Sequence, residues 1–223
     1  MAFRIGVLIS GRGSNLAAVL RAKDRRELSA EVAVVLSDQP TAMGLDFARQ
    51  ANIPIEIVER KPKERSSEAF NEALLHTLLP YKLDLIVLAG FMRIITASFI
   101  DGFDRKVLNI HPSLLPAFKG ANAQRLALEA GASESGCTVH FVTPDVDSGP
   151  IVAQARVPVL GGDTIETLSA RILAEEHKIL PAAIEAIALG QVRITPAGEL
   201  ELRNDINVGP LRQFLIGTTN VGS

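Results

Sequence analysis

The side chains best suited to catalysis lie in two segments of the second half of the chain. Asn109 and His111 are two residues apart at the end of the apolar run 107–110, and Asp147 lies in the turn-rich stretch 143–150. If 107–110 is a strand, Asn109 and His111 point to the same side of it. A carboxamide and an imidazole side by side can both donate hydrogen bonds to an oxygen that gains negative charge. Histidine can also carry a proton near neutral pH.

A carboxylate beside His111 would favour the charged imidazolium, and the stretch 143–150 offers Asp145 and Asp147 for that purpose. Both features also have ordinary explanations. A lone histidine is more often structural than catalytic, and Asp, Ser, Gly and Pro are the usual residues of turns. From the residues alone, an active site at Asn109, His111 and Asp147 is therefore one of two interpretations.

A second candidate site is the segment Gly-Arg-Gly-Ser-Asn at 11–15, which follows an apolar run and precedes a helix-like stretch. Glycines let backbone N–H groups approach an anion, and the amino end of a helix adds positive potential. Leu16 occupies the third glycine position of the dinucleotide fingerprint, and no Gly-Lys-Ser/Thr follows. The segment is compatible with a phosphate site and equally with an ordinary turn before a helix.

The elements that must position these residues alternate along the first half of the chain. Strands are expected at 5–10, 32–36, 53–58, 83–89 and 107–110. Helices are expected at 15–26, 43–51 and 67–79. Apolar strands without alternation indicate a parallel sheet that helices cover on both faces. Ligands bind beyond the carboxyl ends of such strands, where the segments 10–15, 90–95 and 109–116 should converge.

The pattern changes after residue 137. Two strands at 138–142 and 151–159 are expected to pair as a hairpin, a long helix over 164–189 should break or kink at Pro181, and 192–195 with 199–202 should form a small hairpin. Residues from about 204 onward look weakly ordered. The predicted fold is α/β: a Rossmann-like, open, mostly parallel twisted sheet with helices on both faces and a mixed, antiparallel C-terminal edge. One domain is expected over 1–223, with its core at about 1–190 and a small hairpin and tail at about 191–223.

Composition excludes several classes of protein. The 223 residues are 47% hydrophobic and 22% charged with a net charge of −2, so neither disorder of the whole chain nor a basic nucleic-acid or membrane-surface binder is expected. The single cysteine, Cys137, excludes a disulfide framework and four-cysteine metal sites. No run approaches the roughly 20 apolar residues of a membrane helix, and no signal peptide is apparent. We expect a soluble cytoplasmic protein; the oligomeric state is open, with a homodimer among the alternatives.

The other histidines offer no metal site. His76, His140 and His177 are expected to be structural, because none of them has the spacing of the zinc motif HExxH. No G-x-S-x-G nucleophile motif is present, and Cys137 lies in an apolar strand context. No metal is therefore expected.

Four motifs taken together resemble the phosphoribosylglycinamide formyltransferase family. They are GRGSN at 11–15, LAGFMRII at 88–95, LNIHPSLLPAFKG at 108–120 and TVHFVTPDVDSGPI at 138–151. The likeness runs from about residue 3 to about residue 190, in order and without large insertions. It implies a purine-pathway enzyme that transfers the formyl group of 10-formyltetrahydrofolate, a co-substrate, to the amino group of glycinamide ribonucleotide. Both partners are small molecules, and no metal is needed.

The resemblance also implies roles for individual residues. Asn109, His111 and Asp147 correspond to the family's catalytic trio, in which Asn109 and protonated His111 hold the oxyanion and Asp147 keeps His111 charged. The ribonucleotide is expected at Gly13, Ser14, Asn15 and Glu176. The folate is expected at Met92, Arg93, Ile94, Ile95, Thr143, Pro144, Asp145 and Val146.

The chain departs from the family pattern in two places. Many relatives have Gly-Leu-His-Thr-His where Gly120 is followed here by Ala-Asn-Ala-Gln. Many also carry a phosphate-binding arginine where this chain has Ser67, and Arg65 lies two residues earlier. Whether Arg65 replaces that arginine is open.

Three competing functions are expected to look different. A formyltetrahydrofolate hydrolase should carry an extra N-terminal regulatory domain, and a methionyl-tRNA formyltransferase should carry a basic C-terminal domain. A non-catalytic nucleotide-binding module would have no use for Asn109, His111 and Asp147 together.

Overall fold

A computed structural model of the chain describes residues 2–59, 67–195 and 197–202. Two expectations lie outside this range: the weakly ordered tail from about residue 204, and the position of Arg65. The expected α/β fold class is confirmed over the described residues.

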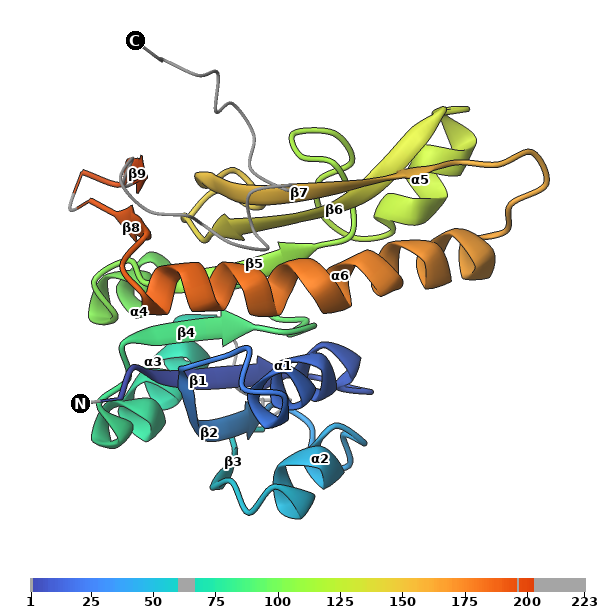
Figure 1. The fold of residues 1–223 in the computed structure, drawn as a ribbon. Coiled ribbons are helices and arrows are strands. Elements are labelled where there is room, and N and C mark those ends of the chain that lie inside the picture. Colours follow the sequence, from blue (N-terminus) through green and yellow to red (C-terminus); the bar gives the residue numbers. More distant parts are fainter. Residues whose placement is uncertain (1, 60–66, 196, 203–223) are drawn as a thin grey trace, which may run out of the picture.

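A seven-stranded sheet forms the centre of the fold, with strand order β3-β2-β1-β4-β5-β6-β7 (Figure 1). The first five strands in this order are parallel to one another, and β6 and β7 are antiparallel to their neighbours. The strands are β1 (Arg4–Ile9), β2 (Glu31–Ser37), β3 (Ile55–Ile57), β4 (Leu85–Leu88), β5 (Val107–His111), β6 (Glu134–Phe141) and β7 (Ile151–Pro158). A separate antiparallel hairpin, as expected near the end of the described chain, pairs β8 (Val192–Ile194) with β9 (Leu200–Leu202).

Helices cover both faces of the sheet (Figure 1). They are α1 (Ser14–Asp24), α2 (Leu45–Gln50), α3 (Ser67–Leu78), the 3-10 turn η1 (Leu79–Tyr81), α4 (Ala97–Gly102), α5 (Ala123–Glu129) and α6 (Ile165–Ala188). Alternate residues of β1 face opposite cores: Ile5, Val7 and Ile9 pack in the cluster with α1 and α6, whereas Leu8 packs in the cluster with α3 and α4. Burial on both faces explains why the strand sequences are apolar without alternation.

Helix α6 is the longest element and runs across one face of the sheet (Figure 1). Its amino end is fixed by a capping box, in which the Thr164 side chain accepts from the Thr167 amide and the Thr167 hydroxyl accepts from the Thr164 amide. The expected break at Pro181 is wrong, because the helix continues as one element through that residue. Pro181 is buried among the residues that pack on the sheet, and this packing supports the helix where proline removes one hydrogen bond.

Two short helices were not expected from the sequence. Helix α4 has six residues and α5 has seven, which is too short for a repeating pattern of apolar residues to stand out. Strand β6 also begins at Glu134, earlier than the expected 138, because residues 134–137 pair with β7.

The loops at the carboxyl ends of β1 and β4 converge as expected. The Ser10 amide donates to the Gly90 carbonyl at 3.2 Å, and the Ser10 hydroxyl accepts from the Met92 amide at 2.8 Å. The side chain of Asn71, in α3, donates to the Ile94 carbonyl and accepts from the Thr96 amide, each at 3.1 Å. Side chains from two other elements thus hold the segment after β4 in place.

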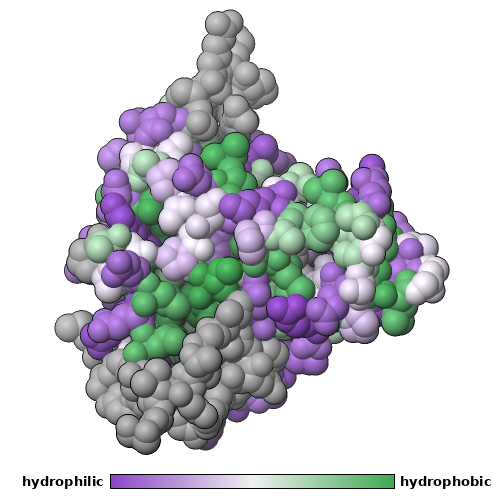
Figure 2. Space-filling model, turned by 90° about the horizontal axis from the view of Figure 1, so that it is seen from above, coloured by the Kyte–Doolittle hydropathy of each residue, from purple (hydrophilic) through white to green (hydrophobic). Residues whose placement is uncertain are grey.

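Exposed apolar residues are distributed over several parts of the surface. On the face seen in Figure 2, hydrophobic residues form patches that hydrophilic residues separate. Among the described residues, no helix is long and apolar enough to cross a membrane.

Candidate active site

A connected group of four side chains lies at the carboxyl end of β5. Asn109 lies opposite His140 in the antiparallel β5–β6 pair, and its Nδ2 is 3.2 Å from Nε2 of His140. The same His140 nitrogen is 3.6 Å from Oδ1 of Asp147, whose Oδ2 is 3.3 Å from Nδ1 of His111. The structure therefore brings the three residues of the expected trio together, and places His140 between Asn109 and Asp147.

His111 lies between two hydrogen-bond acceptors. Its Nε2 is 2.9 Å from the carbonyl oxygen of Phe118, and its Nδ1 faces the Asp147 carboxylate. A carbonyl accepts only from an N–H, so Nε2 carries a proton. The Asp147 carboxylate can accept a hydrogen bond from Nδ1. Each ring nitrogen of His111 thus faces an acceptor.

Asp147 is held as an ionised carboxylate. Burial opposes its ionisation, but the contact with His140, the 2.8 Å hydrogen bond from the Gly120 amide and the charge of His111 together outweigh burial and lower its pKa from 3.8 to about 2. Its backbone has φ 47°, in the left-handed region that few non-glycine residues adopt. Asp147 has this backbone conformation within the turn, and its side chain points back toward His111 at the end of β5.

Residues 118–120 connect the histidine with the aspartate. The Phe118 carbonyl accepts from His111, and the Gly120 amide donates to Asp147. Between them, Lys119 Nζ donates to the Ser148 hydroxyl at 2.6 Å. One short backbone segment thus contacts both members of the His111–Asp147 pair, so its position affects both.

A buried polar network holds the start of that loop. The Thr138 hydroxyl donates to the Ser113 carbonyl at 2.7 Å and accepts from the Leu115 amide at 3.1 Å. Gln154, on β7, donates to the Leu115 carbonyl at 2.7 Å and to the Thr138 hydroxyl at 2.9 Å. Because these groups are buried and paired, they fix where the chain leaves β5.

His140 is the site residue that sequence reasoning missed. It was expected to be structural because it lies inside a strand, yet its position two residues after Thr138 puts both side chains on the face that carries Asn109 and His111. Its Nδ1 is 2.9 Å from the Phe141 carbonyl and therefore carries a proton, and its Nε2 faces both the Asn109 amide and the Asp147 carboxylate. Pairing the predicted 138–142 strand with 107–110 would have revealed this neighbour.

Asn15 and Glu176, both expected at the ribonucleotide, meet across the α1–α6 contact. Asn15 Nδ2 donates to Glu176 Oε2 at 2.7 Å, and both side chains are buried. Asn15 Oδ1 is buried and has no hydrogen-bond partner among the residues that the structure describes. Burial raises the pKa of Glu176, and the Asn15 hydrogen bond only partly opposes it. The pair is a polar site inside an apolar contact between helices.

The glycine segment before α1 has a structural constraint of its own. Gly13 has φ 70° and caps α1, and a Cβ added there would lie 2.5 Å from Cα of Gly44. The Gly44 amide also donates to the Gly11 carbonyl at 3.0 Å. Gly11 itself has open space around it, and Ser14 is half-buried at the start of the helix. Gly13 is therefore required for backbone packing, whatever the segment binds.

The expected folate segment after β4 presents some side chains to the surface and withdraws others. Met92 is 77% exposed and Ile94 is 68% exposed, whereas Ile95 is only 6% exposed and packs in the core with α3 and α4. Ile95 therefore does not offer its side chain to a ligand as expected. The side chain of Arg93 forms an ion pair of 2.6 Å with Asp38.

The other half of the expected folate site is the loop between β6 and β7. Pro144, Asp145 and Val146 are exposed there, and Thr143 is half-buried with its hydroxyl donating to the Asp145 carbonyl at 3.2 Å. The exposed side chain of Val146 adds an apolar group to those of Met92 and Ile94.

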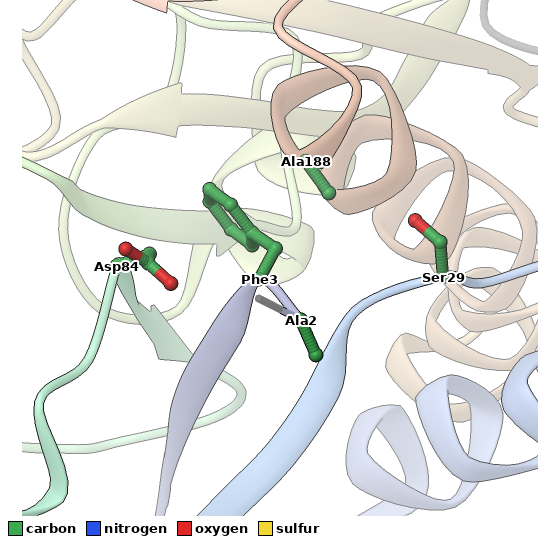
Figure 3. Close-up of a pocket in the computed structure, with 5 residues that line it drawn as sticks. All are labelled: Ala2, Phe3, Ser29, Asp84 and Ala188. Atoms are coloured by element: carbon green, nitrogen blue, oxygen red, sulfur yellow. The ribbon is translucent and has the colours of Figure 1, made fainter.

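The remaining reactive side chains lie elsewhere. His76 is exposed on α3, and Cys137 is buried, where loss of solvation raises the pKa of its thiol. A cavity of about 380 Å³ lies at the amino ends of β1, β2 and β4, where Phe3 is flanked by Asp84 and Ser29 (Figure 3). Asp84 already accepts from the Arg4 amide, and Ser29 donates to Glu185. These polar groups have structural partners, so the cavity has no part in the chemistry described above.

Comparison with known proteins identifies the family. Residues 3–184 match the model of the formyl transferase family. The phosphoribosylglycinamide formyltransferase of Escherichia coli is 42% identical over 190 residues, which cover 85% of this chain and 89% of that protein. The human trifunctional purine biosynthetic protein adenosine-3 is 45% identical over 197 residues, which cover 88% of this chain but only 19% of that longer protein.

Solved structures agree with the sequence comparison. Glycinamide ribonucleotide transformylase 1 of Symbiobacterium toebii superposes with a TM-score of 0.85 at 48% identity, covering 90% of this chain and 94% of that one. A formyltetrahydrofolate deformylase from Pseudomonas syringae superposes with a TM-score of 0.83 at 26% identity, covering 91% of this chain and 66% of that one. The fold is therefore shared by proteins named for formyl transfer and for formyl removal.

The glycine contact before α1 predicts a difference between two substitutions. Gly13→Ala should lower the free energy of unfolding by more than about 1–2 kcal/mol, the usual cost of a left-handed residue with a Cβ, because the new methyl group also meets the Gly44 backbone. Gly11→Ala is the matched control and should change stability by less than about 0.5 kcal/mol. Urea denaturation measures both, and equal stability of the two variants would contradict the contact.

The low pKa of Asp147 predicts a pH-dependent effect of Asp147→Asn. The gap between 3.8 and about 2 corresponds to about 2 kcal/mol of stability, which is fully present above the unfolded pKa and is lost as the pH falls through about 2. The wild-type protein should therefore be more stable than the variant at pH 5 to 7, and the difference should shrink as the pH approaches 2. Denaturant unfolding across this range measures it, with Asp145→Asn as the control. A difference that does not depend on pH would contradict the ionised state.

Proposed function

Because this chain belongs to the formyl transferase family, we propose that it transfers the formyl group of 10-formyltetrahydrofolate to the amino group of glycinamide ribonucleotide. The observation that carries the proposal is the group Asn109, His140, Asp147 and His111 at the carboxyl end of β5. The substrates follow from the chain's coverage of 89% of the Escherichia coli phosphoribosylglycinamide formyltransferase. The proposed products are formylglycinamide ribonucleotide and tetrahydrofolate, in purine biosynthesis.

The reaction requires one bond to form, one to break and one proton to move. The primary amine nitrogen attacks the formyl carbon, and the carbonyl electron pair moves to the oxygen. The resulting tetrahedral oxyanion collapses, the bond from carbon to N10 of the folate breaks, and N10 takes the proton that the amine gives up. No step needs a covalent bond to the protein.

Asn109 supplies a hydrogen-bond donor for the oxyanion. Its Nδ2 lies 3.2 Å from Nε2 of His140, and this contact fixes the orientation of the amide group. Asn109 is half-buried at the end of β5, so that an Nδ2 proton can be donated to a bound substrate. Removing one such donor typically costs about 2.7–4 kcal/mol of transition-state stabilisation.

His111 supplies a second donor. Its Nε2 proton is shared with the Phe118 carbonyl, which is neutral. An oxyanion accepts roughly twice as strongly as a neutral carbonyl, so the developing charge can take over this proton as the transition state forms. The His111 ring therefore stabilises the charged transition state more than the neutral ground state, and this difference is what accelerates a reaction.

Asp147 keeps His111 oriented and stays ionised at neutral pH. A proton from the attacking amine can pass to N10 by way of water or through His111. Positioning of the two substrates supplies much of the remaining acceleration, as much as about 7–11 kcal/mol in well-oriented systems.

The ribonucleotide fits the other end of the site. Backbone N–H groups at the amino end of α1 and the Ser14 hydroxyl suit its phosphate, and Gly11 leaves open space in front of them. Asn15 directly follows Ser14, and its buried pair with Glu176 suits the glycinamide side of the molecule. Gly13 supports this role through its backbone conformation.

The folate fits between the two loops that carry exposed apolar side chains. Met92 and Ile94 from one loop and Val146 from the other suit a flat ring, with backbone groups of 93–95 and 143–147 for its polar edge. The side chain of Arg93 and the residues Thr143, Pro144 and Asp145 lie on the same two loops. Ile95 supports the loop from the core.

Several further expectations remain part of the proposal. They are a single domain, a cytoplasmic location, no requirement for a metal ion, and small-molecule partners without nucleic acid or a membrane. The oligomeric state, including the homodimer alternative, is also left to experiment.

The proposal predicts that the amine, and not water, is the preferred acceptor. With 10-formyltetrahydrofolate present, addition of glycinamide ribonucleotide should release tetrahydrofolate at least about a hundredfold faster than water alone, because a bound amine reacts at a high effective concentration. Absorbance of the folate and mass spectrometry of the formylated product measure the two rates. Equal rates with and without the ribonucleotide would instead identify a hydrolase.

The site predicts losses of kcat for two single substitutions. His111→Ala and Asn109→Ala should each lower kcat by at least about tenfold to a hundredfold with little change in substrate binding, because both donors act mainly in the transition state. The double variant should lose much less than the product of the single losses. His76→Ala, at an exposed histidine of α3, is the control and should keep the normal kcat. A normal kcat in His111→Ala would make that imidazole structural.

A further inference from the structure

A buried carboxylate, that of Asp38 after β2, has no part in the chemistry proposed so far. Asp38 follows the last residue of β2 and is 2% exposed. Its Oδ2 accepts from Arg93 Nε at 2.6 Å and from the side-chain nitrogen Nε2 of Gln39 at 3.4 Å. Its Oδ1 is buried and has no hydrogen-bond partner in the described part of the chain. Burying a charge is costly, so a charge kept here calls for a reason.

The ion pair with Asp38 involves only the Nε side of the Arg93 guanidinium. A guanidinium has five N–H groups in a planar fork, and Asp38 contacts it through Nε. Among the described contacts, Asp38 accepts from Nε and from neither terminal nitrogen, and the Arg93 side chain is 30% exposed. Its neighbours along the chain, Met92 and Ile94, are the exposed apolar residues of the proposed folate site.

The segment around Arg93 depends on side chains from other elements for its shape. Ser10 accepts from the Met92 amide, Asn71 bonds to Ile94 and Thr96, and Asp38 holds Arg93. These three residues lie directly after β1, in α3 and directly after β2. Of the three, only Asp38 carries a full charge, and it alone contacts a side chain of the segment instead of its backbone.

We propose that Asp38 is a positioning residue for the folate site, which holds Arg93 through its Nε and thereby fixes the segment 92–95 against the bound ring. The inference rests on the proposed function, because it names the residue that shapes one of its substrate sites. Asp38 itself touches neither substrate and acts only through Arg93. Its loss should therefore weaken folate binding and leave ribonucleotide binding intact.

The test measures binding of the two substrates separately by titration calorimetry, with tetrahydrofolate as the folate probe. Asp38→Ala should raise the Kd for tetrahydrofolate about tenfold, which corresponds to about 1.4 kcal/mol, with the Kd for glycinamide ribonucleotide unchanged. Asp38→Asn retains an oxygen that can accept from Nε, so its loss should be intermediate. If Asp38→Ala fails to fold, the Asp38→Asn variant carries the test.

A double-mutant cycle shows whether Asp38 acts through Arg93. Arg93→Gln should weaken tetrahydrofolate binding, and Asp38→Ala together with Arg93→Gln should bind no more weakly than Arg93→Gln alone. Asp46→Ala is the matched control, since Asp46 and Arg49 form an ion pair of the same 2.6 Å on the exposed side of α2. This control should bind both substrates like the wild type.

Each outcome separates the inference from the proposed function. An unchanged tetrahydrofolate Kd in Asp38→Ala, equal weakening for both substrates, or additive losses in the cycle would overturn the role of Asp38 even if the protein transfers formyl groups normally. A wild-type protein that binds no tetrahydrofolate would overturn the proposed function and this inference together. Selective, non-additive weakening of tetrahydrofolate binding would establish the positioning role.

Discussion

The register between β5 and β6 is the constraint on which the candidate active site depends. It places Asn109 opposite His140 and His111 opposite Thr138. Side chains alternate between the two faces of a strand, so a shift of one residue would move His140 and Thr138 to the face that α6 covers. Asn109 would lose the side chain that orients it, and the loop after β5 would lose the Thr138 hydroxyl that holds it. The antiparallel edge of the sheet is therefore part of the geometry of the candidate site, although the fold resembles a parallel nucleotide-binding sheet.

The loops at the carboxyl ends of the strands are likewise held by residues that lie outside them. Such loops have few backbone partners, because each extends beyond the sheet that would otherwise bond it. Here their shape comes from single side chains of distant elements, such as Asn71 for the segment after β4 and Gln154 for the segment after β5. Most of these side chains are buried, which makes them rigid supports. Precision in the site is thus provided by residues that do not face the substrates.

The sequence predicted those parts of the protein that repeated patterns or local motifs determine. The apolar runs at 5–10 and 107–110 identified their strands because both faces of the sheet are covered. The short helices α4 and α5 lack such a pattern and were missed. Asn109 and His111 could be proposed from spacing alone, since two positions along a strand share a face. His140 could not be assigned before its pairing with Asn109 was known, and the pairing of Asp38 with Arg93 joins two loops that are 55 residues apart.

Three buried carboxyl groups around the site differ because their surroundings differ. Asp147 receives a backbone amide and lies next to two histidines, so its pKa falls and it remains an anion. Glu176 has only the neutral Asn15 amide as a partner, so burial prevails and its pKa rises. Asp38 has the fixed charge of a guanidinium as its counterion. One carboxyl group is thus stabilised as an anion, one is shifted toward its neutral form, and one forms an ion pair with a cation. When the surroundings shift the pKa values of carboxyl groups apart, a site can use the same functional group in different roles.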